Sequence, residues 1–258
     1  MPRQSLTLLA TAFATLLSTR GAAARSAGDP IRLTWTEGDV AGLSFIYSPD
    51  DAHRQIGSIE YHQHREGDVL TAVRVARFED GSSDEDTAEA RVAGRLEALG
   101  GRSIIRDPDG ETVVDLDIDV TGGHLSGSFG RDDARQTIDR RVDLSPGTYW
   151  GPLIFIVLKN FESNAEDDRL VFRTVAPTPR PIVLDMVLAR GGDAVVERPG
   201  LRLETTRYDL SPTIHWAIDP VIRLVAPRAT FWVLPGEPPA LARFAGPRNY
   251  AREAIVIQ

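Results

Sequence analysis

The feature that most constrains this sequence is a long succession of short segments in which apolar and polar residues alternate. A period of two is typical of a strand with one buried face, and clusters of Gly, Pro, Asp and Asn mark turns between the segments. Because strands joined by short turns pair antiparallel, the pattern predicts a large antiparallel sheet. The expected strands are 31–36, 43–47, 55–65, 69–78, 103–106, 111–120, 124–129, 136–144, 169–175, 182–189, 201–210, 214–218, 221–225, 230–234, 241–244 and 253–257.

One segment departs from the alternation. Ala88, Val92, Leu96 and Leu99 recur at the spacing of one helix face, and two glycines follow them. This spacing predicts a short helix over residues 84–99 that ends at the glycine pair.

The longest apolar run after the N-terminal region lies near the middle of the sequence, at residues 146–161. It can form a buried strand or a short helix that begins after Gly151 and Pro152, and its β-branched and aromatic content favours a strand. We expect this run to cover the concave side of the sheet and to contact both halves of the chain. The fold class predicted is mostly all-β, a large curved antiparallel sheet or half-barrel with one or two short helices.

The N-terminal region has the order of a secretory signal peptide. Arg3 precedes an apolar stretch at residues 6–17, and three alanines at residues 22–24 provide a small-residue cleavage pattern. About 12 apolar residues are too few to span a bilayer as a helix. We therefore expect residues 1–24 to be a signal peptide, residues 25–258 to form a single β-rich domain, and the product to be periplasmic or extracellular rather than membrane-spanning.

Composition excludes several classes of function. The chain has no cysteine, which removes thiol catalysis and thiolate zinc sites. Its net charge is -8, and nucleic-acid binding depends on clustered Lys and Arg that neutralise phosphates. Nucleic acid is therefore not an expected partner.

Two patterns are candidate metal sites. Asp115, Asp117 and Asp119 alternate with apolar residues, so in a strand the three carboxylates share one face about 7 Å apart and could bind calcium. His62 and His64 also share a strand face and could bind zinc if a neighbouring strand supplied a third ligand. The simpler alternative for both patterns is a solvated outer face.

Aromatic residues in the second half of the chain are the other candidates. Large aromatics are usually core residues, but they also line the apolar cavities in which small molecules bind. The predicted ligand-binding residues are Tyr149, Trp150, Tyr208, His215, Trp216 and Trp232.

No strong catalytic signature is present. The closest pattern, Gly-His-Leu-Ser-Gly at residues 123–127, has its Ser one position away from that of a nucleophile elbow and lies between predicted strands. We therefore expect a binding protein without chemistry, one that holds an apolar or lipid-like ligand or an envelope component in the concavity of the sheet. A metal-dependent hydrolase and a structural envelope protein that pairs through an edge strand are the alternatives.

The C-terminal third carries a resemblance. Residues 218–232 and the apolar-Arg-aromatic-x-Gly pattern of residues 241–246 resemble the closing hairpins of uncharacterised exported bacterial proteins. The resemblance implies a strongly curved antiparallel sheet, similar to the half-barrel lipoprotein carriers of the periplasm. The chain differs from these carriers in its greater length and in residues 84–99, and no catalytic residue can be transferred from them.

Overall fold

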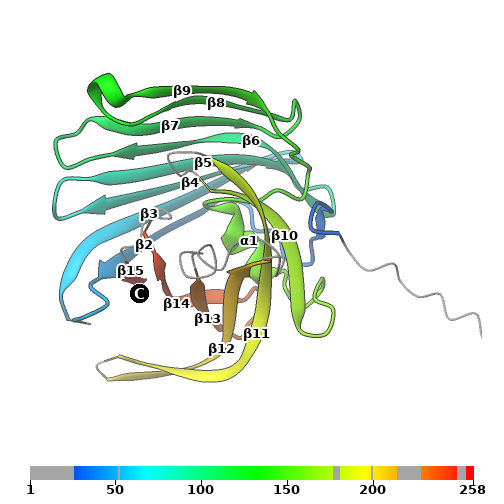
Figure 1. Ribbon diagram of the computed structural model, residues 1–258. Coiled ribbons are helices and arrows are strands. Elements are labelled where there is room, and N and C mark those ends of the chain that lie inside the picture. The colour runs from blue at the N-terminus through cyan, green and yellow to red at the C-terminus, as the bar shows by residue number, and fades with distance from the viewer. Residues whose placement is uncertain (1–25, 52, 177–180, 199, 214–227, 249–253) are drawn as a thin grey trace, which may run out of the picture.

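The computed structural model describes residues 26–51, 53–176, 181–198, 200–213, 228–248 and 254–258 (Figure 1). Within these residues, fifteen strands form one sheet. The strands are β1 (Ile31–Arg32), β2 (Val40–Tyr47), β3 (Gln55–Glu66), β4 (Val69–Phe78), β5 (Ser83–Arg91), β6 (Arg95–Arg106), β7 (Thr112–Asp119), β8 (His124–Phe129), β9 (Gln136–Arg141), β10 (Arg169–Ala176), β11 (Ile182–Arg198), β12 (Leu201–Pro212), β13 (Ala229–Leu234), β14 (Ala240–Pro247) and β15 (Ala254–Ile257). A 3-10 turn, η1 (Asp132–Ala134), precedes β9, and an α-helix, α1 (Leu153–Lys159), precedes β10.

The strand order follows the chain except at one seam and at β1, which pairs with β6. Strands β2 to β9 lie in sequence order, and so do β10 to β15, and each neighbouring pair is antiparallel. The two runs meet where β15 pairs with β2, with Val256 opposite Tyr47 and Ile257 opposite Ile46. The sheet curves so that its two halves face each other across an interior that contains α1 (Figure 1). The predicted class, a large curved antiparallel sheet with short helical elements, is confirmed.

The helix predicted over residues 84–99 is wrong. These residues form most of β5 and the start of β6, joined by a tight turn in which Gly94 has a φ of +75°. Ala88 and Ala90 point inward from β5, and Leu96 and Ala98 point inward from β6. The apolar spacing that also fits a helix comes from inward Ala88 and Leu96 on adjacent strands and from buried Val92 in the turn between them.

The strand favoured for the central run is also wrong. The run turns at Gly151, which has a φ of +47°, and α1 follows Pro152, whose φ of -66° suits a helix start. Leu153, Ile156 and Val157 of the helix are buried. A helix buried on most sides has the same apolar composition as a buried strand, which is why periodicity did not separate them.

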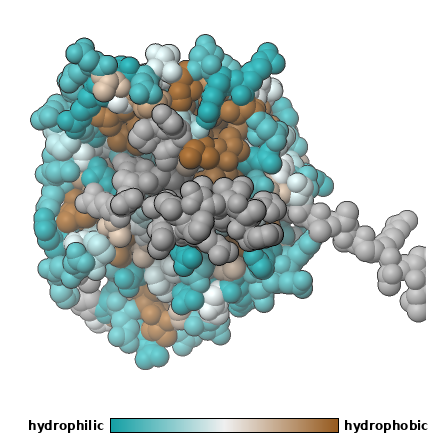
Figure 2. Space-filling model, viewed as in Figure 1, coloured by the Kyte–Doolittle hydropathy of each residue, from teal (hydrophilic) through white to brown (hydrophobic). Residues whose placement is uncertain are grey.

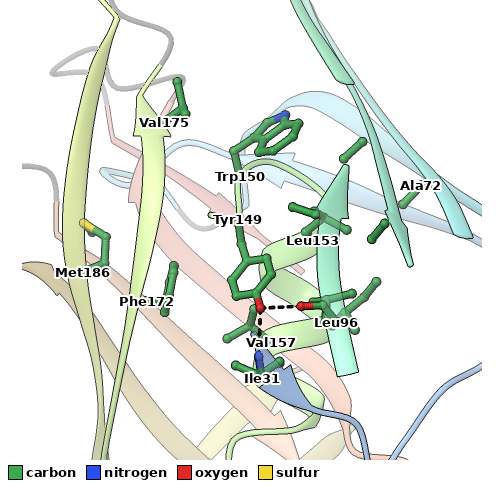
Figure 3. Close-up of a cluster of buried hydrophobic side chains, with 14 of the residues drawn as sticks. Ile31, Ala72, Leu96, Tyr149, Trp150, Leu153, Val157, Phe172, Val175 and Met186 are labelled. Atoms are coloured by element: carbon green, nitrogen blue, oxygen red, sulfur yellow. Dashed lines mark hydrogen bonds between the residues drawn. The ribbon is translucent and has the colours of Figure 1, made fainter. Parts of the chain in front are cut away.

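The central run packs against both halves of the sheet, as expected. Tyr149, Trp150 and Leu153 belong to one apolar core that also contains Leu96 of β6 and Phe172 of β10 (Figure 3). The Tyr149 hydroxyl accepts a hydrogen bond from the Ile31 amide (2.9 Å) and donates one to the Leu96 carbonyl (2.7 Å). The run therefore connects the N-terminal end of the described chain to the middle of the sheet.

Lys159, the only lysine, ends α1 and forms an ion pair with Glu37. Burial lowers the pKa of its ammonium group. The pair holds the end of the helix against the segment before β2. Within the described part of the chain, no helix has the length and hydrophobicity needed to cross a bilayer.

Candidate ligand-binding site

A cavity of about 120 Å³ lies inside the curved sheet. Its lining comes from both halves of the chain: β4 to β6 on one side, β10 to β15 on the other, and the start of the α1 region between them. On the face shown in Figure 2, hydrophilic residues dominate the outline of the molecule, and apolar residues gather toward the middle of its upper part. Its volume is close to that of an engineered apolar cavity of about 150 Å³ that binds benzene. A small ring or a short hydrocarbon chain therefore fits this volume.

Most of the cavity wall is apolar. On β13, Phe231 and Val233 are buried while Trp232 between them faces the other way. Phe231 packs against Phe244 of β14 with ring centroids 5.1 Å apart. Alternation in the other strands directs similar side chains inward. The apolar lining is Ile105, Ile154, Phe155, Phe172, Met186, Leu210, Ala229, Phe231, Phe244, Pro247 and Ile257.

The opposite wall contains a buried polar group on β4, β5 and β6. Asp86 is only 4% exposed; it forms an ion pair with Arg74, and its Oδ1 accepts a hydrogen bond from the Ser103 hydroxyl (2.7 Å). Burying a carboxylate is costly unless it is paired and hydrogen-bonded, and Asp86 is both. The arrangement places a polar group against an otherwise apolar cavity.

Asp84, two residues earlier on β5, also lines the cavity and is 4% exposed. Arg248 lies beside it, with Nε 3.8 Å from the Asp84 carboxylate and its guanidinium 3.4 Å from the centroid of the Phe78 ring. The two buried aspartates of β5 therefore each have an arginine next to them.

Two buried side chains of the cavity lining carry hydrogen-bond donors. Trp150 is 1% exposed and Thr174 of β10 is 2% exposed, and both line the cavity. Neither the indole Nε1 nor the Thr174 Oγ1 has a hydrogen-bond partner among the described residues. Because buried polar groups are nearly always hydrogen-bonded, two such donors in one cavity call for an explanation.

The predicted aromatic set is only partly brought together. Trp150 lines the cavity. Tyr149 is a buried core residue with both hydroxyl bonds made within the protein. Tyr208 is also buried; it packs edge-on against Phe161 at 4.7 Å and donates to Glu162, and burial is the main cause of its raised pKa.

The remaining predicted residues of this set lie away from the cavity or outside the described residues. Trp232 is on the face of β13 opposite to Phe231, where the Arg243 guanidinium lies 5.0 Å from its ring centroid. This stacking is a cation–π contact between two partly buried side chains, away from the cavity. His215 and Trp216, with the two strands expected at residues 214–218 and 221–225, fall outside the described residues.

The three aspartates of β7 alternate with buried residues as predicted. Asp115 forms two hydrogen bonds of 2.7 Å with the Arg102 guanidinium, and these lower the pKa of its carboxyl. Asp117 lies 3.9 Å from the same guanidinium, and Asp119 accepts the Gly122 amide (2.8 Å). The carboxylates therefore face a cation and a backbone amide of the protein itself.

The histidines of β3 are exposed. His64 Nδ1 lies 2.8 Å from Asp39, and His62 Nε2 lies 3.8 Å from Glu60. Among the described residues, no group of three or more His, Cys, Asp or Glu side chains has the geometry to hold a metal ion.

A second, wider hollow of about 610 Å³ lies on the outer face over β5, β6 and β7. Its charged lining includes Glu85, Glu89, Arg102 and Asp117, which alternate with the inward residues of the same strands. Among the described residues that line this surface depression, no buried donor or acceptor lacks a partner, whereas Trp150 and Thr174 contribute uncharged donors of that kind to the inner cavity.

Sequence reasoning missed the polar wall. Ser82, Asp84 and Asp86 are buried, and the residues between them are less so. This inverted alternation, polar residues inward, was available as a signal, but it was hidden by the helical interpretation of residues 84–99. Arg74 and Ser103 carried no local signal, because only the pairing of β4, β5 and β6 brings them to Asp86.

Comparison with known proteins adds one structural likeness. No protein-family model matches the sequence, and no curated protein matches it significantly. Among solved structures, the chain is similar to a β-barrel-like protein of the domain of unknown function DUF1849 from Brucella abortus. The two share 11% sequence identity with a TM-score of 0.49 over 88% of this chain and 96% of the other. What this chain does is therefore inferred from its own residues.

Proposed function

We propose that this protein is an exported, non-catalytic binding protein that holds a small apolar ligand, or the apolar end of a larger lipid-like one, inside its curved sheet. The observation that carries the proposal is the inner cavity, which is lined by apolar side chains from both halves of the sheet and bordered by a buried polar group. Such a combination, mostly apolar with a few placed polar groups, is the usual form of a small-molecule site.

The cavity wall supports a ligand rather than a reaction. Asp86 is paired with Arg74 and hydrogen-bonded by Ser103, and the described residues of the cavity lining include no His or Lys that could activate a hydroxyl as a nucleophile. General acid–base chemistry needs a group poised to move a proton to a substrate. The described lining offers packing surface and hydrogen-bond donors instead. The N-terminal sequence supports a periplasmic or extracellular location for this role.

Native mass spectrometry of protein isolated without detergent tests the proposal. The wild type is expected to carry an apolar molecule that is released on unfolding, and saturation-transfer NMR is expected to show that toluene binds to the emptied protein. Ala229→Phe would place a ring into the cavity, because Ala229 lines it from β13, and should abolish both signals. Ala41→Phe, on the exposed face of β2, is the matched control and should retain them.

Two results would end the proposal. One is a wild type that carries no adduct and does not bind toluene. The other is an Ala229→Phe variant that is folded by circular dichroism and still binds as the wild type does.

A further inference from the structure

The two unpartnered donors of the cavity point to the chemistry of its ligand. The indole N–H of Trp150 and the hydroxyl of Thr174 are almost fully buried and meet no acceptor in the described part of the protein. Leaving a buried donor without a hydrogen bond destabilises the protein. A ligand atom that accepts a hydrogen bond from such a donor would offset this cost on binding.

Backbone pairing places the two segments that carry these donors next to each other. Thr148 forms a parallel bridge with Arg173, and the Tyr149 amide donates to the Arg173 carbonyl (2.8 Å). Trp150 directly follows Tyr149, and Thr174 directly follows Arg173. In Figure 3 the indole nitrogen of Trp150 is turned away from Leu153 and the packed core. Both residues line the cavity, so the two donors come from neighbouring parts of its wall.

The charges around the cavity favour an uncharged ligand. Arg74 is paired with Asp86, and Asp84 has Arg248 at 3.8 Å, so these four groups sum to zero. An anionic ligand would have to approach two buried aspartates without a cation left over to compensate it. A cation would meet two donors, which repel it.

Building on the proposed binding function, we propose that the ligand carries an uncharged acceptor oxygen, such as the carbonyl of a ketone, ester or amide. This oxygen accepts hydrogen bonds from Trp150 Nε1 and Thr174 Oγ1, while the apolar body of the ligand contacts Phe172 and Phe231.

A matched pair of small probes tests the proposal. Cyclohexanone and methylenecyclohexane have nearly the same shape and differ in a carbonyl oxygen against a CH₂ group. Binding is measured by ¹H–¹⁵N NMR of the indole N–H signals; the chain has four tryptophans, and Trp150→Phe identifies the signal of Trp150. Cyclohexanone is expected to bind roughly tenfold more tightly and to move the Trp150 indole proton downfield, while methylenecyclohexane binds without that downfield shift.

Thr174→Val removes one donor with little change of shape. It should reduce the preference for cyclohexanone severalfold and leave the affinity for methylenecyclohexane unchanged. Thr71→Val, on the side of β4 opposite to the buried Leu70 and Ala72, should change neither.

The outcomes separate this inference from the proposed function. Equal affinities without an indole shift, or tighter binding of cyclohexanecarboxylate, would overturn the uncharged acceptor and leave an apolar binding site intact. Failure of every probe, toluene included, would overturn the binding function itself.

Discussion

Asn160 shows how a single residue can join distant parts of this chain. It follows α1 directly and is fully buried. Its Oδ1 accepts the amides of Thr34 (2.7 Å) and Trp35 (2.8 Å), and its Nδ2 donates to the carbonyls of Trp35 (3.0 Å) and Ile156 (2.9 Å). An asparagine amide has two donors and an acceptor oxygen with two lone pairs, so this side chain is completely used.

Asn160→Ala should therefore lower the free energy of unfolding by about 2–4 kcal/mol, because two backbone amides lose their acceptor in a buried position. Urea denaturation followed by circular dichroism measures the change. Asn164→Ala is the matched control: Asn164 makes a similar contact to Arg32 but in an exposed setting, and it should cost about 1 kcal/mol. Equal losses in the two variants would show that Asn160 has no special role.

The Asp115–Arg102 pair gives a pH-dependent prediction. Hydrogen bonds from Arg102 hold the pKa of the Asp115 carboxyl below its usual value, which is about 3.9 in unfolded chains. A depressed carboxyl pKa contributes stability that is complete above pH of about 4 and is lost as the pH falls through the folded-state pKa.

Asp115→Asn should reduce the free energy of unfolding at pH 7 by about 1 kcal/mol or less, since the pair is partly exposed. The difference from wild type should shrink below pH of about 4. Asp117→Asn, at a mostly exposed carboxylate, should have a smaller effect. The prediction fails if the Asp115→Asn difference grows on acidification.

At the level of elements, the glycines after residue 99 have a role that the sequence did not reveal. A Cβ on Gly101 would lie 2.1 Å from the Thr87 carbonyl oxygen and 2.8 Å from the Cζ2 atom of Trp150. The absence of a side chain at Gly101 of β6 therefore leaves room for the Trp150 indole, which borders the cavity. The glycine does not end a helix, as the sequence had suggested.

Gly101→Ala should lower the free energy of unfolding by about 2 kcal/mol or more, because both neighbours are held by packing or backbone pairing. It should also change the near-ultraviolet circular dichroism of the buried tryptophan. Gly42→Ala, on exposed β2 with no atom within 4 Å of the added carbon, should be neutral or slightly stabilising. A Gly101→Ala variant as stable as the wild type would contradict the close packing of Trp150 on β6.

Sequence reasoning did well where the signal is local. The predicted pair 55–65 and 69–78, joined at Glu66-Gly67-Asp68, is the observed β3–β4 hairpin, because alternation and turn residues are both encoded in neighbouring positions. It failed at β5, β6 and α1, where helix and strand periods fit the same apolar residues. Of the candidate site, Trp150 was predicted, whereas Arg74, Asp86 and Ser103 depend on strand pairing and were not.

At the level of the whole molecule, the cavity results from how the sheet closes on itself. The seam between β15 and β2 joins the ends of the described chain, and it brings Phe231 and Ile257 to the space that Asp86 and Trp150 border from the other half. No segment of the sequence contains this arrangement, since it brings together residues as far apart along the chain as Asp86 and Ile257. The central run fills only part of the interior.

A crystal of the protein pressurised with xenon gives the most direct test of this account, because xenon enters dry apolar cavities and is located by its anomalous scattering. If the interior holds an open apolar cavity, a xenon peak is expected inside the sheet, bordered by Trp150, Phe172 and Phe231. An interior without a xenon peak, with side chains occupying that space, would contradict it.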